Sequence, residues 1–440
     1  MPQQSEMLMF ENLKSVLGKI DTECVDLTRE VMESVDRELA NVKGEVTSFL
    51  DAIKAHLTQY PEPIFAILRR IKPILLFENY ALVTRFEDVQ EVLSRDDVFL
   101  VIYGKKMRVV TGGEDFFLGM QNSPEYTRDV SHMRSVVRRE DIPGRIAPFV
   151  QKTAGDLVAA AGGQLDVVQL SKTVPARWIA DYFGCPPLSD QQVEAWGSVL
   201  FQYLFLDVEN DPKLAQAAAS TAAEVRNWLD ETIAARKPSR VSKDDVLGRC
   251  LLLQSAGLPA MDDVSIRNNI LGLLVGAIPT TSKCCAQVLD QLFQRPEQLK
   301  AAQAAALTDD DALLAKYVFE ALRFNPNNAG VYRLAAEDYP LAKASFHGTT
   351  IPKGTSVIAA TQSAMFDERF VDQPNEFRID RPEYLSMHFG YGLHTCFGKY
   401  INRVQIPGIL KPLLKRPGLR RAGDLQYAGP FPSSLLVRFD

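Results

Sequence analysis

The stretch HFGYGLHTCFGKYINR (residues 388–403) places Cys396 among three glycines, Gly390, Gly392 and Gly398, and a helix is expected to begin just after it. Glycines let the backbone approach a neighbour closely or adopt positive φ. A helix that starts beyond a cysteine directs unpaired N–H groups and its positive dipole end at the sulfur. Both effects lower the pKa of the thiol. The stretch therefore predicts a thiolate fixed in place by backbone hydrogen bonds, which could be a nucleophile or a metal ligand.

Ligation of iron is the interpretation that fits better. A nucleophile needs a base beside it, but His394, two residues away, would point elsewhere in an extended segment. The glycines leave room for a flat macrocycle over the sulfur. The six cysteines form no C-x-x-C pair and the five histidines form no HExxH pair, so a bound metal is expected to bring its own chelate. The alternative for Cys396 is a buried, inert thiol.

Three motifs, taken together, resemble the cytochrome P-450 family. The order F-G-x-G-x-H-x-C-x-G, from Phe389 to Gly398, looks like its haem-thiolate signature. The sequence EALR (320–323) is similar to its E-x-x-R, and PNEFRIDR (374–381) is similar to the segment whose arginine completes a Glu-Arg-Arg cluster. With YALVTRFEDVQEVL (80–93), the match spans about residues 60–440. An E-x-x-R alone would be weak evidence, since such pairs are common on helices.

The resemblance implies haem b as the cofactor and a role for each matched residue. Cys396 would be the axial iron ligand, whose electron donation favours O–O cleavage in this family. Phe389 would shield the sulfur, with Gly390 and Gly398 shaping the loop. His394 and Arg333 would bind the haem propionates, through charge-assisted hydrogen bonds in the case of arginine. A structural role, not a chemical one, is implied for the ion cluster of Glu320, Arg323 and Arg381.

One further propionate contact departs from the family pattern. The family usually has a histidine followed four residues later by an arginine, but SPEYTRDVSHMRSVVRR (123–139) offers Tyr126 and Val130 in the better register. A shifted register uses His132 instead. We expect Tyr126 to donate one hydrogen bond. A basic patch for an acidic electron donor could form from Arg134, Arg138, Arg139 and Lys399, or these side chains could simply be solvated. Nothing in the chain resembles a flavin or iron–sulfur domain. The electron donor would therefore be a separate ferredoxin- or flavodoxin-type protein.

The long apolar stretch from about 264 to 293 is predicted to be one helix, with Pro279 at its middle. Family members carry Ala/Gly-Gly-x-Asp/Glu-Thr there, and alignment places Gly276 and Ala277 at the small pair, Pro279 at the acid and Thr280 at the threonine. Gly276, Ala277 and Thr280 would then lie nearest the bound oxygen. No Asp or Glu occurs between Asp263 and Asp290, and Asp263 would lie more than about 20 Å from Thr280 along a helix. The usual carboxylate relay is therefore absent.

Three functions follow from this departure. The first is a monooxygenase that oxidises a lipophilic molecule with dioxygen and electrons, its protons delivered by water held at Thr280 or at the Val275 carbonyl that Pro279 frees. The second is peroxide- or hydroperoxide-driven chemistry, for which Lys283 is a weak candidate to anchor a substrate carboxylate. The third is a non-catalytic haem sensor. The aromatic stretches VLFQYLFL (199–206) and EDFFLGM (114–120) argue mildly for a substrate cavity, although core packing would also explain them.

Composition indicates a globular protein. Of 440 residues, 46% are hydrophobic and 24% charged, and the net charge of −6 argues against a general nucleic-acid binder. The scattered cysteines, the lack of about 18 uninterrupted apolar residues and the charged N-terminus favour a soluble, cytoplasmic protein without a membrane span.

The predicted fold is mainly α within the α+β class, a single large cytochrome P-450 domain over residues 59–440 with small β-sheets near both sequence ends. Residues 1–58 are expected to be a helical extension. A hairpin is predicted over 74–86, a short helix at about 87–94, a loop over 95–125, mostly helix from 126 to 320, and strands again at 331–360.

Overall fold

The computed structural model describes residues 62–207, 210–237 and 243–440, and the expected helical extension over residues 1–58 lies outside them. Helices make up most of the described chain. They are α4 (Glu62–Ile71), α5 (Phe86–Ser94), α6 (Gly104–Thr111), α7 (Pro124–Val136), α8 (Ala147–Ala160), α9 (Val167–Phe183), α10 (Asp190–Phe201), α11 (Pro212–Arg236), α12 (Val246–Ser255), α13 (Asp263–Phe293), α14 (Pro296–Leu307), α15 (Asp311–Phe324), α16 (Thr361–Ala364) and α17 (Lys399–Leu414). The residues just after α10 form a further short helical turn, Gln202–Leu206.

The strands form small sheets that combine distant parts of the sequence. The largest has the order β1-β2-β8-β5-β3, in which only β2 and β8 run parallel. The remaining strands form the sheet β4-β12-β9 and the pairs β6-β7 and β10-β11. Their bounds are β1 (Ile74–Phe77), β2 (Tyr80–Val83), β3 (Phe99–Leu100), β4 (Gln164–Asp166), β5 (Val331–Ala335), β6 (Tyr339–Leu341), β7 (Thr349–Ile351), β8 (Ser356–Ala359), β9 (Arg420–Arg421), β10 (Gln426–Ala428), β11 (Phe431–Ser434) and β12 (Leu436–Arg438).

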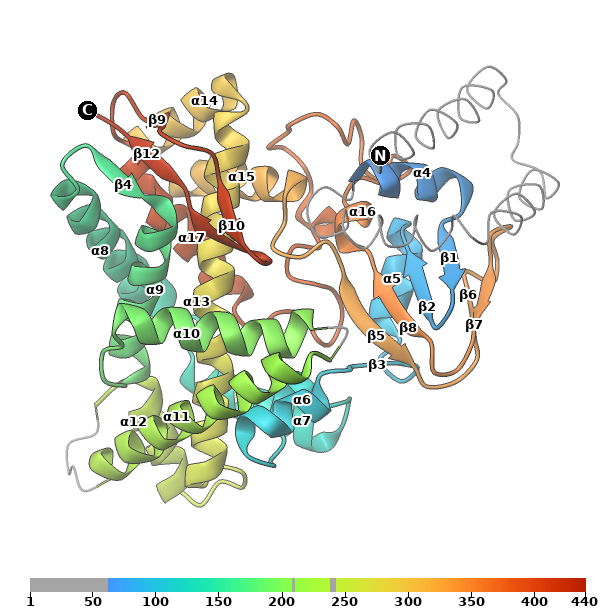
Figure 1. Cartoon of the computed structure of the whole chain (residues 1–440), viewed down its shortest axis with the longest axis horizontal. Helices are drawn as coiled ribbons and strands as arrows, with labels where there is room; N and C mark the ends of the chain where they lie inside the picture. Colours follow the sequence, from blue (N-terminus) through green and yellow to red (C-terminus); the bar gives the residue numbers. More distant parts are fainter. Residues whose placement is uncertain (1–61, 208–209, 238–242) are drawn as a thin grey trace.

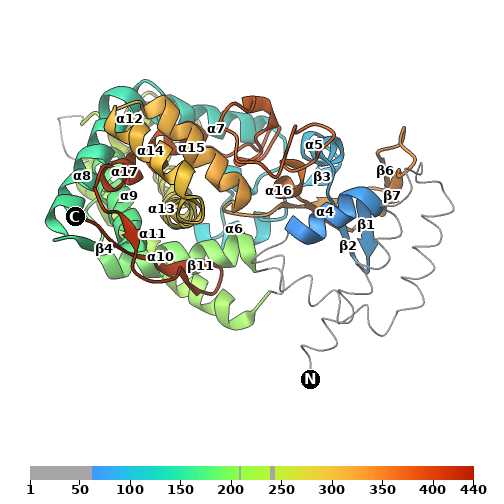
Figure 2. The ribbon, with the colours of Figure 1, turned by 90° about the horizontal axis from the view of Figure 1, so that it is seen from above.

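The long helix α13 is the axis around which the other helices pack. Figure 1 shows it running through the helical half of the molecule, with the five-stranded sheet in the other half. Figure 2 looks nearly along this helix and shows other helices grouped around it. Between residues 266 and 292 most of its side chains are buried. A helix buried on most of its sides is stabilised mainly by its packing in the core, which explains why it tolerates an interior proline.

Most of the predicted elements are present, including the hairpin as β1 and β2, the short helix as α5 and the long helix as α13. The prediction of a loop over 95–125 was wrong, because β3 and α6 lie within it. Helix α6 has no side-chain N-cap, so its local signals are weak. Contacts from elsewhere hold it: Arg226 donates to the Val110 carbonyl (2.7 Å) and Arg267 to the Thr111 carbonyl (3.0 Å).

In the part of the chain that the structure describes, no helix combines the length and the apolar character needed to cross a membrane.

Candidate active site

The ligand loop, residues 388–398, is fixed by backbone hydrogen bonds and by one glycine that nothing else could replace. The Cys396 N–H donates to the Phe389 carbonyl over 2.9 Å, which closes the loop before α17. Gly392 has φ +73°, and a Cβ there would lie 2.5 Å from the Leu93 carbonyl oxygen at the end of α5. Only glycine meets both conditions. The loop therefore presents Cys396 from a backbone that is docked on α5.

The backbone N–H groups of Gly398 and Lys399 lie near the Cys396 sulfur and act to lower the pKa of its thiol. The expected direction of its pKa shift was wrong. Part of Cys396 is exposed, yet protein atoms crowd the sulfur on its other sides, and this desolvation raises the pKa of the thiol more than the two N–H groups lower it. A metal cation bound at the sulfur would reverse the balance by displacing the proton. The donor geometry suits a thiolate ligand.

A cavity of about 150 Å³ lies beside the loop and is bordered by Arg333, His394 and Tyr126. Arg333, only 4% exposed, donates to the neighbouring Tyr332 carbonyl (2.9 Å) and forms no ion pair with any carboxylate of the described residues. Desolvation lowers the pKa of Arg333, and desolvation together with this nearby guanidinium lowers the pKa of His394 to about 4. A buried cation without a counterion requires an anion. A haem propionate satisfies that requirement.

Tyr103, Arg134 and Thr395 also border the cavity, and the other side chains of its wall are apolar. They are Val101, Phe117, Leu118, Val130, Phe205, Val331 and Phe397. The stretches 114–120 and 199–206, predicted to line a cavity, thus contribute Phe117, Leu118 and Phe205. Phe117 also lies against Phe397, with ring centroids 5.5 Å apart.

Tyr126 borders this cavity, and its ring lies edge-on to His394 with centroids 4.9 Å apart. Its hydroxyl donates to the Leu393 carbonyl over 3.0 Å. Because a phenol has a single hydrogen to donate, a hydrogen bond to a propionate would have to replace this one. His132, the alternative, does not border the cavity. The role of Tyr126 toward haem stays a prediction.

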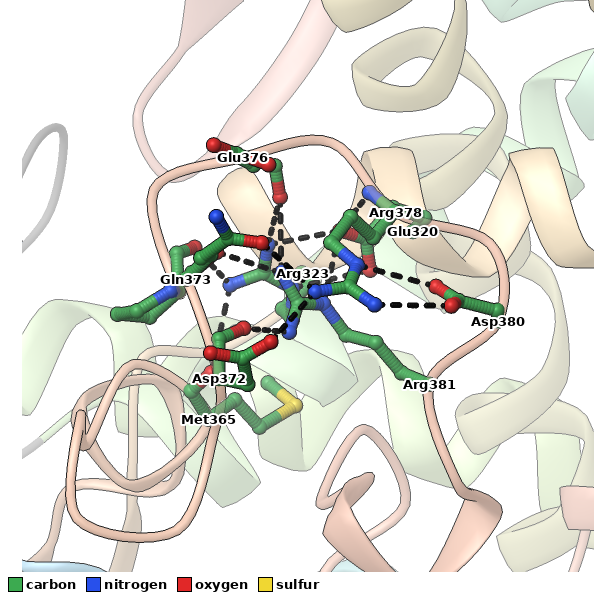
Figure 3. Close-up of polar contacts among 10 residues, drawn as sticks. Glu320, Arg323, Met365, Asp372, Gln373, Glu376, Arg378, Asp380 and Arg381 are labelled. Carbon is green, nitrogen blue, oxygen red and sulfur yellow. Dashed lines mark hydrogen bonds and ion pairs between the residues drawn. The ribbon is translucent and has the colours of Figure 1, made fainter.

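The structure brings Glu320, Arg323 and Arg381 together behind the ligand loop (Figure 3). Both arginines pair with the Glu320 carboxylate, Arg323 at 2.7 Å and Arg381 at 3.2 Å. Arg323 also donates to the backbone carbonyls of Pro374 (2.7 Å) and Glu376 (3.0 Å). The cluster therefore connects α15 to the chain segment that leads into the ligand loop.

Phe389 packs on the same helix, where its ring centroid lies 5.8 Å from that of Phe319. This contact anchors the start of the ligand loop on α15.

Helix α13 continues without interruption through Pro279. Gly276, Ala277 and Thr280 are partly exposed although most of the residues around them are buried, so this face of the helix borders open space. A Cβ on Gly276 would meet no atom within 4 Å, and the Thr280 hydroxyl donates to the Gly276 carbonyl over 2.5 Å. Pro279 points to another side, since a Cβ on Gly197 of α10 would lie 3.3 Å from its Cδ.

A polar connection between α13 and α17 escaped the sequence reasoning. The Gln405 amide donates to the Thr281 hydroxyl over 2.8 Å, and Asn402 lies 3.1 Å from the same hydroxyl. Thr281 and Gln405 are each 1% exposed. The signal available was the pair Asn402 and Gln405 at a spacing of three on a helix that otherwise buries apolar residues.

Comparisons with known proteins agree with this geometry. The family model for cytochrome P-450 matches residues 197–416, half of the chain. Curated relatives include mycinamicin IV hydroxylase/epoxidase of Micromonospora griseorubida, 27% identical over 82% of this chain and 87% of that protein. Nocardicin C N-oxygenase of Nocardia uniformis subsp. tsuyamanensis is 29% identical over 82% of this chain and 89% of its own.

Solved structures show the same fold. The crystal structure of CalO2 superposes with a TM-score of 0.74 at 23% identity, covering 88% of this chain and 97% of that one. The open form of EryK from S. erythraea gives 0.72 at 23% identity, covering 86% and 95%. The chain therefore belongs to the cytochrome P-450 family, as an enzyme of the haem-thiolate type with haem b as its cofactor.

Proposed function

We propose that the protein oxidises a lipophilic small molecule with dioxygen and with electrons from a separate electron-donor protein. The observation that carries this proposal is a basic surface beside the ligand loop. Arg134, Arg138 and Arg139 are exposed and form no ion pair within the described ranges, and Arg134 also borders the cavity beside the ligand loop. Arg134 lies over the ring of Phe397, next to Cys396, at 4.9 Å. Such a surface suits an acidic electron donor.

Two further contacts define this surface. Arg139 lies 3.5 Å above the ring of Tyr400 on α17, close to the ligand loop. Lys399, predicted as part of the patch, instead faces Glu383 at 3.6 Å and contributes less free charge. A peroxide-driven enzyme has no need of a docking surface for a reductant, so the free arginines favour the electron-driven reaction.

When bound, haem activates dioxygen or peroxide so that an oxygen atom can pass to a substrate. The residues of the chain position the reaction. Cys396 would hold the iron, Arg333 would offer a cation for a propionate, and the open face of α13 would leave room for oxygen and substrate. Thr280 keeps its hydroxyl at that face, where its oxygen can still accept a hydrogen bond. Pro279 has no N–H, so the Val275 carbonyl lacks its helical donor and can hold a water for proton delivery.

The lipophilic substrate class is supported by the aromatic rings that border the haem cavity and continue beyond it, from Phe205 through Phe201 to Phe431. Tyr103, Phe117 and Phe205 present aromatic surface to the cavity. Pockets lined in this way gain affinity by removing apolar ligand surface from water. The relatives named as a hydroxylase/epoxidase and an N-oxygenase are consistent with oxygen transfer to small molecules.

A second candidate, peroxide-driven oxidation, is favoured by the absence of a carboxylate on α13 between Asp263 and Asp290. Asp290 itself is occupied, since it pairs with Arg421 at 2.5 Å. A reaction that begins from a peroxide needs one proton-delivery step fewer than a reaction that begins from dioxygen. The lack of an acid on this part of the helix is therefore less of an obstacle to peroxide-driven oxidation.

The two candidates are separated by supplying the haem-loaded protein either with a ferredoxin, its reductase and dioxygen, or with hydrogen peroxide or a lipid hydroperoxide. We expect product from a panel of apolar compounds with the electron-transfer proteins, tightly coupled to the reductant consumed. Product with peroxide alone, or reductant consumption without product, would establish the second candidate.

Pro279→Asp tests the missing acid, with Pro279→Asn as the uncharged control. We expect the aspartate variant to raise coupled, reductase-driven turnover several-fold over the asparagine variant, because a positioned acid contributes on the order of tenfold or more to proton transfer. Equal turnover of the two variants would place proton delivery away from residue 279.

A further inference from the structure

Lys283, on α13, is a buried lysine without a counterion. Its side chain is 9% exposed, and neither a hydrogen bond nor an ion pair involves its ammonium among the described residues. The one contact of its Nζ is with the ring of Phe431, whose centroid is 5.9 Å away. Desolvation lowers the pKa of Lys283 to about 8. The group is therefore still largely charged near pH 7 in a place that provides no anion.

Lys411 shows how this protein normally buries a lysine. It is 6% exposed, and its ammonium lies 2.6 Å from Asp311 and 2.9 Å from Asp309. Burial of an unpaired charge is costly. Arg333 is buried without a carboxylate as well, but a haem propionate accounts for it. Nothing in the haem site accounts for Lys283.

The position of Lys283 on α13 places it at the edge of the open face. At 3.6 residues per turn, a residue seven positions further along lies only about 20° around the helix and about 10 Å along its axis, so Lys283 faces the same side of α13 as Gly276, where a Cβ would meet no atom within 4 Å. Side chains on a helix lean toward its N-terminus. That lean directs the Lys283 side chain toward the turn that contains Pro279 and Thr280, and its Nζ lies 5.9 Å from the centroid of the Phe431 ring.

An aromatic wall connects this position with the cavity beside the ligand loop. Ring centroids of Phe431 and Phe201 lie 5.6 Å apart, those of Phe201 and Phe205 lie 4.8 Å apart, and those of Phe205 and Tyr103 lie 4.9 Å apart. Phe205 and Tyr103 border the cavity. The row of rings therefore runs from the Lys283 ammonium to the cavity beside the ligand loop.

We propose that Lys283 binds a carboxylate of the substrate, so that the enzyme acts on lipophilic monocarboxylic acids. This inference rests on the proposed oxidation of a lipophilic molecule and specifies its class. An ammonium has three donors and one charge, which a carboxylate matches. A phosphate dianion would leave a second charge buried without a partner, and a neutral ligand would leave the ammonium unpaired.

Binding to the haem-loaded protein tests the proposal directly. The probes are dodecanoate and 4-phenylbutyrate, each compared with its methyl ester, and the readouts are the ligand-induced change in the haem spectrum and calorimetry. We expect each acid to bind wild type at least tenfold more tightly than its ester. Lys283→Met should bring the affinity of the acid to that of the ester, and Lys283→Arg should keep part of the difference. Lys300→Met, at an exposed lysine of α14, should behave as wild type.

Three outcomes contradict the proposal. Equal binding of acids and esters to wild type overturns the role of Lys283 but leaves the lipophilic substrate class intact. Binding of neither probe overturns both. Preference for the acid that survives in Lys283→Met places the carboxylate site elsewhere. A normal spectrum of the reduced, carbon-monoxide-bound haem in each variant shows that the ligand loop is undisturbed.

Discussion

The Glu320–Arg323–Arg381 cluster and the middle of α13 are both buried, and they hold charge in different ways. In the cluster, Glu320 satisfies two arginines, and backbone carbonyls take up their remaining donors. On α13, Lys283 has no acceptor among the described residues, and no acid replaces the one missing at Pro279. Charges that are paired within the protein stabilise its framework. Charges left unpaired, at Arg333 and Lys283, indicate where an anion from outside the chain is expected.

Breaking the cluster should have the largest effect on stability. Glu320→Gln removes the carboxylate and leaves Arg323 and Arg381 without their counterion, which should cost about 3–5 kcal/mol of the free energy of unfolding. The measurement is denaturant unfolding of the haem-loaded protein. Asp156→Asn, which breaks an exposed pair with Lys152, is the control and should cost less than about 1 kcal/mol. A loss as small as the control's would show that the cluster does not fix the loop region.

Removing the unpaired charge on α13 should instead raise the free energy of unfolding. Burial lowers the pKa of Lys283 from 10.5 to about 8, so between these values the unfolded chain binds a proton that the folded chain does not. Stability of wild type should therefore rise as pH increases from about 8 to 10.5. Below pH 8 the charged lysine costs up to about 3 kcal/mol, at about 1.4 kcal/mol per pKa unit.

Lys283→Met should accordingly stabilise the ligand-free protein by up to about 3 kcal/mol at pH 7, and the gain should disappear above pH 10.5. Unfolding free energies at both pH values provide the test, with Lys300→Met as the exposed control. A destabilised variant at pH 7 would mean that Lys283 has a partner in solution.

The smallest effect is expected at the basic surface. Arg139→Glu should weaken binding of a ferredoxin-type donor by about tenfold or less at low salt, and the difference should fade as ionic strength rises, because exposed charges are screened. Steady-state reduction of the haem at several donor concentrations measures it, with Arg420→Glu as a distant control. Unchanged donor dependence at low salt would place the docking surface elsewhere.

The sequence allowed prediction of those parts whose geometry is local. The ligand loop follows from glycines around Cys396, and the pairing of Glu320 with Arg323 follows from their spacing on one helix. Helix α6 was not predictable, because Arg226 and Arg267 from distant helices hold its carbonyls. The direction of the pKa shift of Cys396 also escaped prediction, since it depends on how many protein atoms surround the sulfur.

Whether Lys283 has a partner also depends on contacts between distant parts of the chain. Its position on α13 was readable from the sequence, but its lack of a partner depends on which side chains α9, α10 and β11 bring to that face. The sequence alone therefore made Lys283 a weak candidate to bind a substrate carboxylate. The structure adds that its ammonium is buried against the ring of Phe431.

Thiolate ligation of haem by Cys396 underlies all of these proposals, and the spectrum of the reduced protein with carbon monoxide tests it most directly. Wild type should show the red-shifted band typical of thiolate-bound haem. Cys396→Ala should bind haem without that band, because Arg333 and the cavity walls remain while the sulfur is lost. Persistence of the band in Cys396→Ala, or its absence from wild type, would contradict the assignment of Cys396 as the iron ligand.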